Sequence, residues 1–378
     1  MSTKSPESKR SLLYLSAYDP HVPLTGSGTR GAEFVNILAE RFHLDLVYID
    51  GSGQPPIPEL SEKFSSKIKG VREKHRINFT QFDYFVFSRS LYKEAVSLLE
   101  RNKYDLILCD YGFSALYGII LSRKFNVPFI YCSHNIEYNG YIDKAKKDIR
   151  RIVFVPYIFL VERMGVLKSK ILVAISENDA DFYTRWVKRD KMIVIPQGID
   201  DSIFNPFYEP KQNNPKIVLF CGNFNIQPNR DVVKTVMEQI LEKVLKECPN
   251  TTFRFIGANP PKNLNHPNVE FTGFVVDYPS CLKEADIFIS PMKEGWGSPT
   301  KIFEALACGK HVIATPIGSR SVERDYQSLH VCEIDRFPQT ICEILKSGEF
   351  VNAMDFEKMK VRYSWRVNIQ RLIDKMEN

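Results

Sequence analysis

Short apolar runs recur along the chain and alternate with longer segments whose apolar residues recur at helical spacing. In the first half, the runs that predict strands are 11–16, 44–49, 106–108, 128–132 and 171–175. A second series follows at 192–195, 216–221, 252–256, 269–272, 287–290 and 311–314. Strands that alternate with helices are typical of parallel sheets covered by helices. The pattern therefore predicts an α/β protein.

Both halves open with a strand, a loop and a helix. In the first half, Gly26 and Gly28 belong to a loop that precedes a helix predicted over 32–42. In the second half, the loop 222–231 precedes a helix predicted over 232–245. This repetition indicates two Rossmann-like domains.

Length and composition agree with a soluble globular protein of two domains. The 378 residues exceed one ordinary core, and 44% of them are apolar and 25% charged. The stretch 196–214 is rich in Pro, Asn, Gly and Gln and lacks periodicity, which favours a domain boundary. We expect an N-terminal domain over 1–200, a C-terminal domain over 201–354 and a helix over 355–378.

The net charge and the cysteines indicate which substrates and which compartment suit the protein. The net charge of +6 does not indicate a dedicated nucleic-acid binder, and it suits anionic substrates such as nucleoside diphosphates. The eight cysteines are scattered without a CxxC pair, which argues against a zinc site or a disulfide framework and for a reducing cytosol. No signal peptide or membrane-spanning run is predicted. We expect a cytoplasmic protein.

The segment 294–309 is the most informative part of the sequence. A predicted strand leads into Gly295 and Gly297, which allow close approach of the backbone to a ligand. Ser298 suits the N-cap of a following helix, and Pro299 suits its first position. The exposed amides of a first helical turn, including that of Thr300, form a site for a phosphate.

The helix that follows carries two charged residues on one face. Lys301 and Glu304 are three residues apart. This spacing places a cation near the phosphate and a carboxylate one turn deeper, where it can accept hydrogen bonds from sugar hydroxyls. Gly309 is in the position of a C-cap.

The pattern of glycine loop, Lys301, Glu304-Ala-x-Ala-x-Gly309 and an apolar strand ending in Ala-Thr-Pro resembles the donor motif of GT-B glycosyltransferases. It is most similar to the retaining GT4 family (glycosyltransferase group 1), and the resemblance extends from Gly26 to about Gly318. It implies two facing Rossmann-like domains with a cleft between them, an acceptor-side domain over 1–200 and a nucleotide-sugar donor domain over 201–354. It also implies that the C-terminal helix over 355–378 crosses back to the N-terminal domain. It also implies transfer of a sugar from a nucleoside diphosphate, UDP or GDP, to an acceptor hydroxyl with retention and without a metal or cofactor.

His134 directly follows the predicted strand 128–132, and ligand contacts in α/β proteins lie at the carboxyl ends of parallel strands. A lone histidine can equally be structural. The segment around Cys109 and Asp110, followed by the run up to His134 and Glu137, is similar to a GT4 segment. The resemblance implies that His134 bonds the transferred sugar, and it makes His134, Lys301 and Glu304 the candidate catalytic residues.

The resemblance also implies a set of donor-binding residues. They are Gly26, Gly28, Asn229, Arg230, Val275, Glu294, Gly297, Ser298, Pro299 and Thr300. The glycine spacing at 26–31 departs from the dinucleotide pattern GxGxxG, which argues against a dehydrogenase. Gly26 and Gly28 are alternatively parts of a plain tight turn, and Arg230 is alternatively a solvated loop charge.

Two departures from the family leave questions open. Many members carry a first glutamate seven residues before the second, where this chain has Trp296, and Glu294 lies two residues too early. The group that contacts the hydroxyls of the donor sugar is therefore undecided. The cation that meets the pyrophosphate is either Arg230 or Lys301, because the familiar Gly-Arg…Lys-Gly version is missing.

A basic cluster precedes an apolar run at 152–161. The cluster consists of Lys144, Lys146, Lys147, Arg150 and Arg151. Basic charge beside an apolar stretch suits contact with the inner face of a membrane. The interpretation that the sequence favours is a solvated helix face followed by a core helix.

Two alternatives to a transferase remain open from the sequence. A degenerate GT-B domain would bind a nucleotide sugar or a partner without turnover, and Trp296 keeps this alternative open. A sugar-nucleotide 2-epimerase would use the nucleotide sugar without an acceptor. If the chain is a transferase, a carbohydrate, a lipid-linked molecule or a small molecule is the acceptor.

Overall fold

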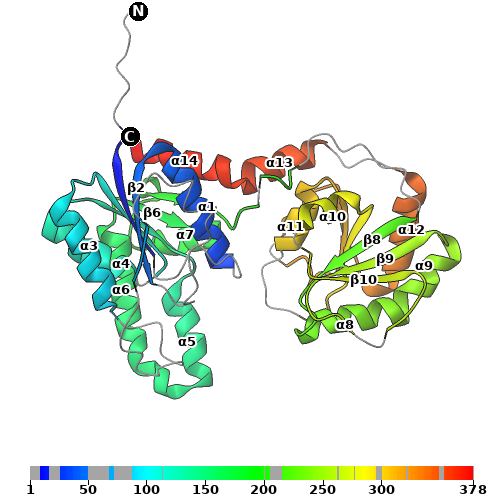
Figure 1. Cartoon of the computed structure of the whole chain (residues 1–378). Helices are drawn as coiled ribbons and strands as arrows, with labels where there is room; N and C mark the ends of the chain where they lie inside the picture. The colour runs from blue at the N-terminus through cyan, green and yellow to red at the C-terminus, as the bar shows by residue number, and fades with distance from the viewer. Residues whose placement is uncertain are drawn as a thin grey trace, which may run out of the picture. The chain divides into compact units, whose positions relative to one another are not determined.

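The computed structural model describes most of the chain. The described residues are 9–16, 26–49, 68–71, 87–112, 114–199, 201–204, 215–261, 264–275, 277–294, 300–320, 322–348 and 353–377. Contacts divide the chain into two units. Unit 1 comprises Met1–Gly198 and Asn368–Asn378, and unit 2 comprises Ile199–Val367 (Figure 1).

Unit 1 contains a parallel sheet that is seven strands wide in the described residues. The strands are β1 (Ser11–Ser16), β2 (His43–Ile49), β3 (Ile68–Val71), β4 (Leu106–Asp110), β5 (Phe129–Cys132), β6 (Ile171–Ala174) and β7 (Met192–Val194). Their order across the sheet is β3-β2-β1-β4-β5-β6-β7, and every paired neighbour is parallel.

Helices cover the sheet of unit 1 because each of them has an apolar side. They are α1 (Gly26–Arg41), α3 (Arg89–Arg101), α4 (Ser114–Phe125), α5 (Glu137–Lys147), α6 (Val155–Lys168) and α7 (Glu177–Tyr183), with short helices η1 (Ile149–Phe154) and η2 (Arg189–Lys191). Leu13, Ile107 and Tyr131 of the strands pack against Leu98 of α3 and Leu121 of α4 in one buried cluster. The burial of apolar area in this cluster stabilises the sheet.

Unit 2 contains a parallel sheet that is six strands wide in the described residues. The strands are β8 (Lys216–Cys221), β9 (Thr251–Ile256), β10 (Val269–Gly273), β11 (Ile287–Ser290), β12 (His311–Ala314) and β13 (Leu329–Val331). Their order is β10-β9-β8-β11-β12-β13, again with parallel neighbours.

The helices of unit 2 cover both faces of this sheet. They are α8 (Gln227–Thr235), η3 (Val236–Ile240), α9 (Leu241–Glu247), α10 (Tyr278–Glu284), α11 (Thr300–Ala307), η4 (Ile334–Arg336), α12 (Phe337–Ser347) and α13 (Ala353–Tyr363). The last helix, α14 (Trp365–Glu377), belongs to unit 1 from Asn368 onward. Leu219 joins the cluster under α10 and α11, whereas Phe220 joins the cluster under α8 and α9 (Figure 1). The alternation explains why β8 is apolar at every position from Ile217 to Cys221.

The predicted α/β class is confirmed, and the predicted apolar runs all form strands within one or two residues of their expected ends. One assignment was wrong. The run at 192–195 was placed in the second series, but β7 pairs with β6 in the sheet of unit 1. Short strands β3 and β13 were not predicted. The residues of β13 are only partly buried, so its apolar signal is weak.

The predicted starts of two helices were also wrong. Gly26 to Gly31 were predicted as a loop, but α1 begins at Gly26. The buried Arg30 fixes this turn, because its Nη1 donates hydrogen bonds to the carbonyls of Ile195 (2.9 Å) and Pro196 (3.1 Å). Similarly, α8 begins at Gln227, with a proline in its first turn.

The C-terminal segment was predicted as one helix and forms two. Ser364 separates α13 from α14, and its Oγ accepts the backbone N–H of Val367 at 3.2 Å. Ser364 also forms an isolated parallel bridge with Ile199. A side chain that caps a new helix favours a break in the middle of an apolar-periodic segment.

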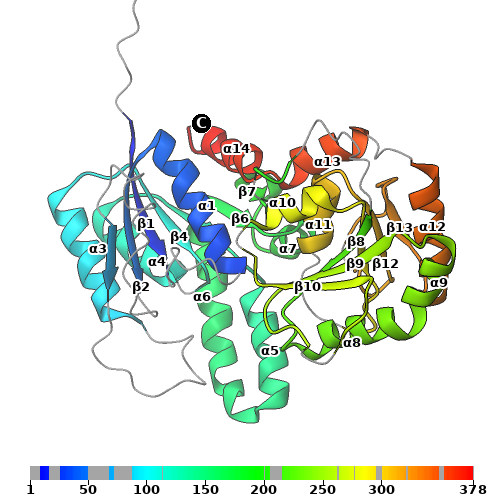
Figure 2. The same cartoon turned by 45° about the vertical axis from the view of Figure 1, so that its right-hand side comes forward.

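The end of α14 contacts residues of unit 1 that are distant in sequence. Nζ of Lys375 donates a hydrogen bond to the carbonyl of Asp190, and Arg10 donates to the carbonyl of Met376 at 2.9 Å. Arg41 forms an ion pair with Glu377 at 2.9 Å. These contacts attach the last turn of the chain to unit 1 (Figure 2).

Candidate functional site

The strand order of each sheet reverses at one point. In unit 1, the connections lead outward in opposite directions from β1 and β4, and in unit 2 they do so from β8 and β11. Loops at the carboxyl ends of such strands diverge, and ligands of open α/β sheets bind in the crevice between them. The predicted site residues that the structure describes lie mainly in loops and first helical turns after strands.

In unit 2, Lys301 connects the two strands at this reversal. It lies in the first turn of α11, which follows β11, and its Nζ donates a hydrogen bond of 2.6 Å to the carbonyl of Cys221 at the end of β8. An ammonium group has three donors, so this bond leaves capacity for an anion. The side chain thus holds a positive charge at the crevice.

Tyr278 joins Glu304 to the same strand end. Its hydroxyl lies 3.1 Å from Sγ of Cys221, and it is hydrogen-bonded to the side chain of Glu304. Burial raises the pKa of Tyr278 well above its usual value, and the neighbouring Cys221 and Glu304 raise it further. Tyr278 therefore stays a neutral hydroxyl that donates to the carboxylate.

Cys221 is buried at the centre of this cluster. Burial raises the pKa of its thiol to about 11, against the opposing influence of Lys301. A thiol with a raised pKa is a poor nucleophile at neutral pH. Cys221 therefore acts through its position, with its carbonyl holding Lys301 and its sulfur beside Tyr278.

Side chains from the start of α8 hold the loop after β8 in place. Arg230 donates to the carbonyls of Phe224 (2.9 Å) and Asn225 (2.7 Å), and Asn229 donates to the carbonyl of Asn223 (2.8 Å). Arg230 was predicted as a candidate phosphate cation or a solvated loop charge. In the structure it holds the loop in shape, and its contact with a phosphate stays a prediction.

The other predicted donor residues differ in their surroundings. Val275 is partly buried against the core of unit 2, Glu294 is exposed, and Thr300 is the first residue of α11. Gly26 and Gly28 lie in the first turn of α1. Gly297, Ser298 and Pro299 lie outside the described residues, as does Trp296. Gly309 ends α11 with a φ of 68°, which confirms the predicted C-cap.

In unit 1, His134 is positioned by an acidic partner. Its Nε2 lies 2.7 Å from Oδ1 of Asp110 at the end of β4, and both side chains are buried. Tyr111 packs edge-on against the imidazole, with ring centroids 5.2 Å apart. A carboxylate beside one ring nitrogen fixes the orientation and the tautomer of a neutral histidine.

A buried polar network holds the loop that carries His134. Oγ of Ser133 donates to the carbonyl of Asn135 at 2.7 Å and lies 2.8 Å from the hydroxyl of Tyr183. Tyr183 in turn donates to the carboxylate of Glu162 at 2.7 Å. Ser133, Tyr183 and Glu162 are all buried, so the loop has little freedom to move.

Glu162 also caps the helix that follows the loop. Its two carboxylate oxygens accept the backbone N–H groups of Glu137 (2.9 Å) and Tyr138 (3.1 Å) at the start of α5. A negative charge at a helix N-terminus is favourable. Burial nevertheless raises the pKa of Glu162, against the opposing effect of these hydrogen bonds.

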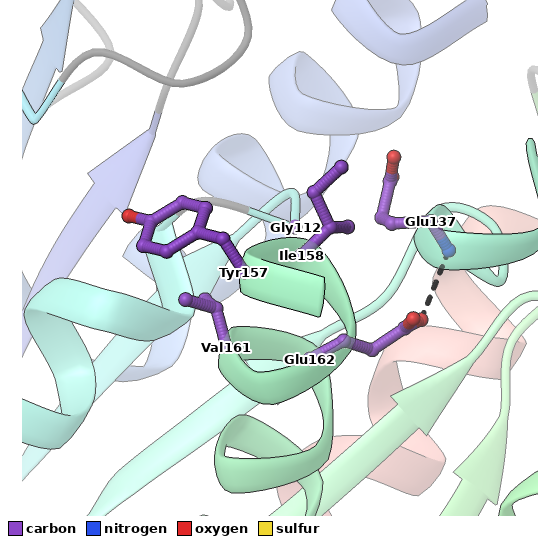
Figure 3. A pocket seen from close by; sticks show the side chains of 6 residues that line it. All are labelled: Gly112, Glu137, Tyr157, Ile158, Val161 and Glu162. Carbon is purple, nitrogen blue, oxygen red and sulfur yellow. Dashed lines mark hydrogen bonds between the residues drawn. The ribbon is translucent and has the colours of Figure 1, made fainter. Parts of the chain in front are cut away.

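A small pocket adjoins this network (Figure 3). It is lined by Gly112, Glu137, Tyr157, Ile158, Val161 and Glu162. Gly112 is necessary here because a Cβ at this position would lie 2.6 Å from Cγ of Glu137. Figure 3 shows the bond between Glu162 and the backbone nitrogen of Glu137 at one side of the pocket.

Sequence reasoning missed Tyr278, Glu162 and Tyr183. Glu162 is a charged residue in the mostly apolar helix α6, and Tyr278 and Tyr183 are single tyrosines in the short helices α10 and α7, so each is a weak signal without a partner. Their partners are distant in sequence, so the hydrogen bonds become visible only in the fold.

Three further observations bear on the predictions from composition. All eight cysteines are free in the structure. Among the described residues, no three His, Cys, Asp or Glu side chains gather closely enough to hold a metal ion. No helix in the described part of the chain is long and apolar enough to cross a membrane.

Two family models match the chain, one in each unit. The model described as Glycosyltransferase Family 4 matches residues 25–203, and the model described as Glycosyl transferases group 1 matches residues 215–347. No curated protein matches the chain. The two matched regions together cover most of the sequence.

Solved structures of glycosyltransferases share the fold. HepE of Anabaena in complex with UDP is 14% identical, with a TM-score of 0.66 over 97% of this chain and 99% of that chain. A glycosyltransferase of Rickettsia africae is 15% identical, with a TM-score of 0.64 over 97% and 98%. TarM is 13% identical, with a TM-score of 0.61 over 97% and 99%. The matches in both units and the shared fold identify the chain as a glycosyltransferase of the GT-B fold.

Proposed function

We propose that this glycosyltransferase takes a sugar from a nucleoside diphosphate donor and transfers it to an acceptor hydroxyl with retention and without a metal. The observation that carries the proposal is the bond from Lys301 to the carbonyl of Cys221. It holds a cation in the first turn of α11, at the point where the strand order of unit 2 reverses. A crevice at such a point, beside a helix N-terminus, suits a diphosphate.

Lys301 stabilises the leaving group in this proposal. As the bond between the anomeric carbon and the diphosphate breaks, negative charge accumulates on the diphosphate oxygens. A fixed ammonium group and the amides of the first turn of α11 lower the energy of that charge without reorganising. Because the protein supplies this positive potential, we expect turnover to persist in EDTA.

Glu304 recognises the donor through its hydroxyls. The carboxylate lies one turn deeper than Lys301 and is hydrogen-bonded to Tyr278, which limits its rotation. A carboxylate held in this way accepts hydrogen bonds from the two neighbouring hydroxyls of a ribose. Tyr278 is a positioning residue, since it acts through Glu304.

His134 contacts the transferred sugar in this proposal. Asp110 fixes the imidazole, and Ser133, Tyr183 and Glu162 fix the loop that carries it. Such a ring orients a sugar hydroxyl and does not act as a nucleophile. The remaining predicted donor contacts, from Gly26 to Thr300, belong to the same proposal.

The structural relatives suggest which donor to test first. HepE has been crystallised with UDP and with UDP-glucose. A uridine donor is therefore the first choice, and a GDP-linked donor the second. The acceptor is a carbohydrate, a lipid-linked molecule or a small molecule.

The test is a thermal-shift and hydrolysis screen with UDP-, GDP- and ADP-sugars, run with and without EDTA. The Lys301→Met variant is compared with Lys243→Met, which changes an exposed lysine of α9. Removing a charged hydrogen bond to the diphosphate is expected to slow nucleoside diphosphate release by about tenfold to hundredfold, whereas the control keeps wild-type rates. The anomeric configuration of the product, read by NMR, tests retention.

The same screen separates the alternatives. A donor that raises the melting temperature without release of nucleoside diphosphate, with any acceptor, indicates a degenerate binding domain. Conversion of one free nucleotide sugar into its 2-epimer indicates an epimerase. Loss of turnover in EDTA, restored by a divalent cation, would contradict the metal-free part of the proposal.

A further inference from the structure

Large apolar side chains are exposed on one segment of unit 1, from η1 to the end of α6. They are Ile149 (72% exposed), Ile152 (48%), Val153 (69%), Tyr157 (39%), Leu160 (57%) and Leu167 (37%). Tyr157, Leu160 and Leu167 are three and seven residues apart, so they follow one side of α6, and Val153 lies just before this helix in η1. The sequence favoured a core helix here, but only one side of α6 is buried.

The opposite side of α6 is buried. Ile158, Val161 and Val166 face the interior, and Gly165 packs against Ala115 of α4 and Tyr131 of β5. A helix that is apolar all round is normally covered on both sides. Among the described residues of unit 1, only the inner side of α6 is covered, so the outer side is suited to contact with another apolar phase.

Basic residues accompany the exposed apolar residues along this segment of the sequence. The sequence from Lys144 to Arg151 contains five basic residues and one acidic residue, a net charge of +4. Lys146 on α5 and Arg163 and Lys168 on α6 are exposed. An apolar stripe flanked by cations suits a lipid bilayer, whose anionic headgroups lie over an apolar interior.

We propose that α5, η1 and α6 dock on an anionic lipid surface. The two helices run side by side and extend past the strands of the unit 1 sheet, with η1 at the tip (Figures 1 and 2). Ile149, Ile152 and Val153 at the tip enter the acyl boundary of the bilayer, while the basic side chains meet the headgroup phosphates. No helix in the described residues can span a bilayer, so the contact is interfacial.

This inference is independent of the transfer chemistry, because none of its residues is in the proposed donor site. It is tested by sedimentation of the full-length protein with vesicles of phosphatidylcholine alone and of phosphatidylcholine with phosphatidylglycerol. We expect binding to the anionic vesicles that weakens as salt rises, and little binding to the neutral vesicles.

Two double variants test the two parts of the surface. Val153→Asn with Leu160→Asn removes exposed apolar area and is expected to weaken vesicle binding by about tenfold or more. Lys146→Glu with Arg163→Glu reverses two charges and is also expected to weaken binding by about tenfold or more. All four side chains are exposed or on the outer side of the segment, so the fold is expected to persist.

Matched controls change similar residues in unit 2. Val361 is 61% exposed and Leu264 is 40% exposed, and their replacement by Asn is expected to leave vesicle binding unchanged. Lys243→Glu serves as the control for charge reversal. Donor hydrolysis in detergent-free buffer is expected to stay at the wild-type rate in every variant, which shows that the donor site is intact.

Three outcomes would overturn the proposal. The first is no difference between anionic and neutral vesicles, and the second is equal loss of binding in the unit 2 controls. The third is a dimer by light scattering that the Val153 and Leu160 variant converts to a monomer while vesicle binding is unchanged. That last result would assign the apolar stripe to a second copy of the chain.

Discussion

Nε2 of His134 lies 2.7 Å from Oδ1 of Asp110, and both side chains are almost completely buried. The pair joins the ends of β4 and β5, two neighbouring strands of unit 1. A buried carboxylate in this position determines which ring nitrogen carries the proton, and so determines which polar groups the ring can meet.

The Asp110→Asn variant tests this relationship. The amide keeps the volume of the carboxylate but loses its charge, so the preferred tautomer and orientation of His134 change. We expect kcat to fall by about tenfold to hundredfold, with a much smaller change in donor affinity. Steady-state kinetics with the donor identified by the screen measure both quantities.

Asp181→Asn is the matched control, because Asp181 is an exposed residue of α7 in the same unit. It is expected to keep the wild-type kcat. If Asp110→Asn also retains full activity while its melting temperature falls, Asp110 is structural only, and the proposed sugar contact of His134 loses its main support.

Tyr278→Phe tests the positioning of Glu304. The change removes one hydroxyl, which lies 3.1 Å from Sγ of Cys221 and is hydrogen-bonded to Glu304. We expect the free energy of unfolding to fall by about 1 kcal/mol, the usual contribution of one hydrogen bond. We also expect KM for the donor to rise severalfold, because the carboxylate is no longer held.

Tyr326→Phe is a close control for this prediction. Tyr326 is also buried in unit 2, and its hydroxyl accepts a hydrogen bond from Arg362 at 3.1 Å. A similar loss of stability with an unchanged KM is expected. Equal rises of KM in both variants would show that the effect of Tyr278 is general destabilisation.

The strands were predictable because they are buried on both faces and therefore form continuous apolar runs, as β8 illustrates from Ile217 to Cys221. The positions of Lys301 and Glu304 on a helix were predictable because the motif is local. Their partners were not. Cys221 lies 80 residues before Lys301, and Tyr278 lies 57 residues after Cys221, so only the folded sheet brings them together. The start of α1 was predicted wrongly for the same reason, since Arg30 of α1 bonds the distant carbonyls of Ile195 and Pro196.

The buried Glu162 predicts a dependence of stability on pH. Burial raises its pKa above the ordinary value of 4.5, so the folded state favours the protonated form more than the unfolded state does. The stability gained by protonation is present at low pH and is lost as pH rises through the folded pKa. We expect wild type to gain stability over Glu162→Gln as pH falls from neutral toward about 5.

Denaturant unfolding of wild type and Glu162→Gln across this pH range measures the difference. Glu100→Gln, which changes an exposed residue of α3, is expected to show no such dependence. A difference between wild type and Glu162→Gln that is constant from neutral to acidic pH would contradict the assignment.

The backbone is tightly packed at Gly257, close to the proposed donor site, and a substitution there tests the importance of this packing. Its φ of 140° is a conformation that residues with side chains rarely adopt, and an added Cβ would lie 1.9 Å from the carbonyl oxygen of Gly222. Gly222 directly follows Cys221, whose carbonyl holds Lys301, so a displaced Gly222 also displaces the proposed phosphate cation. We therefore expect Gly257→Ala to destabilise the protein by about 3 kcal/mol or more and to weaken donor binding.

Gly348→Ala separates backbone strain from this close approach. Gly348 also has a positive φ, 61°, but an added Cβ there has no neighbour within 4 Å. The strain alone costs about 1–2 kcal/mol, and donor affinity is expected to stay unchanged. Equal destabilisation of both variants in denaturant unfolding would show that strain at Gly257 is the whole effect. A larger loss at Gly257, together with a smaller thermal shift on adding donor, would tie the close backbone contact at the end of β8 to donor binding.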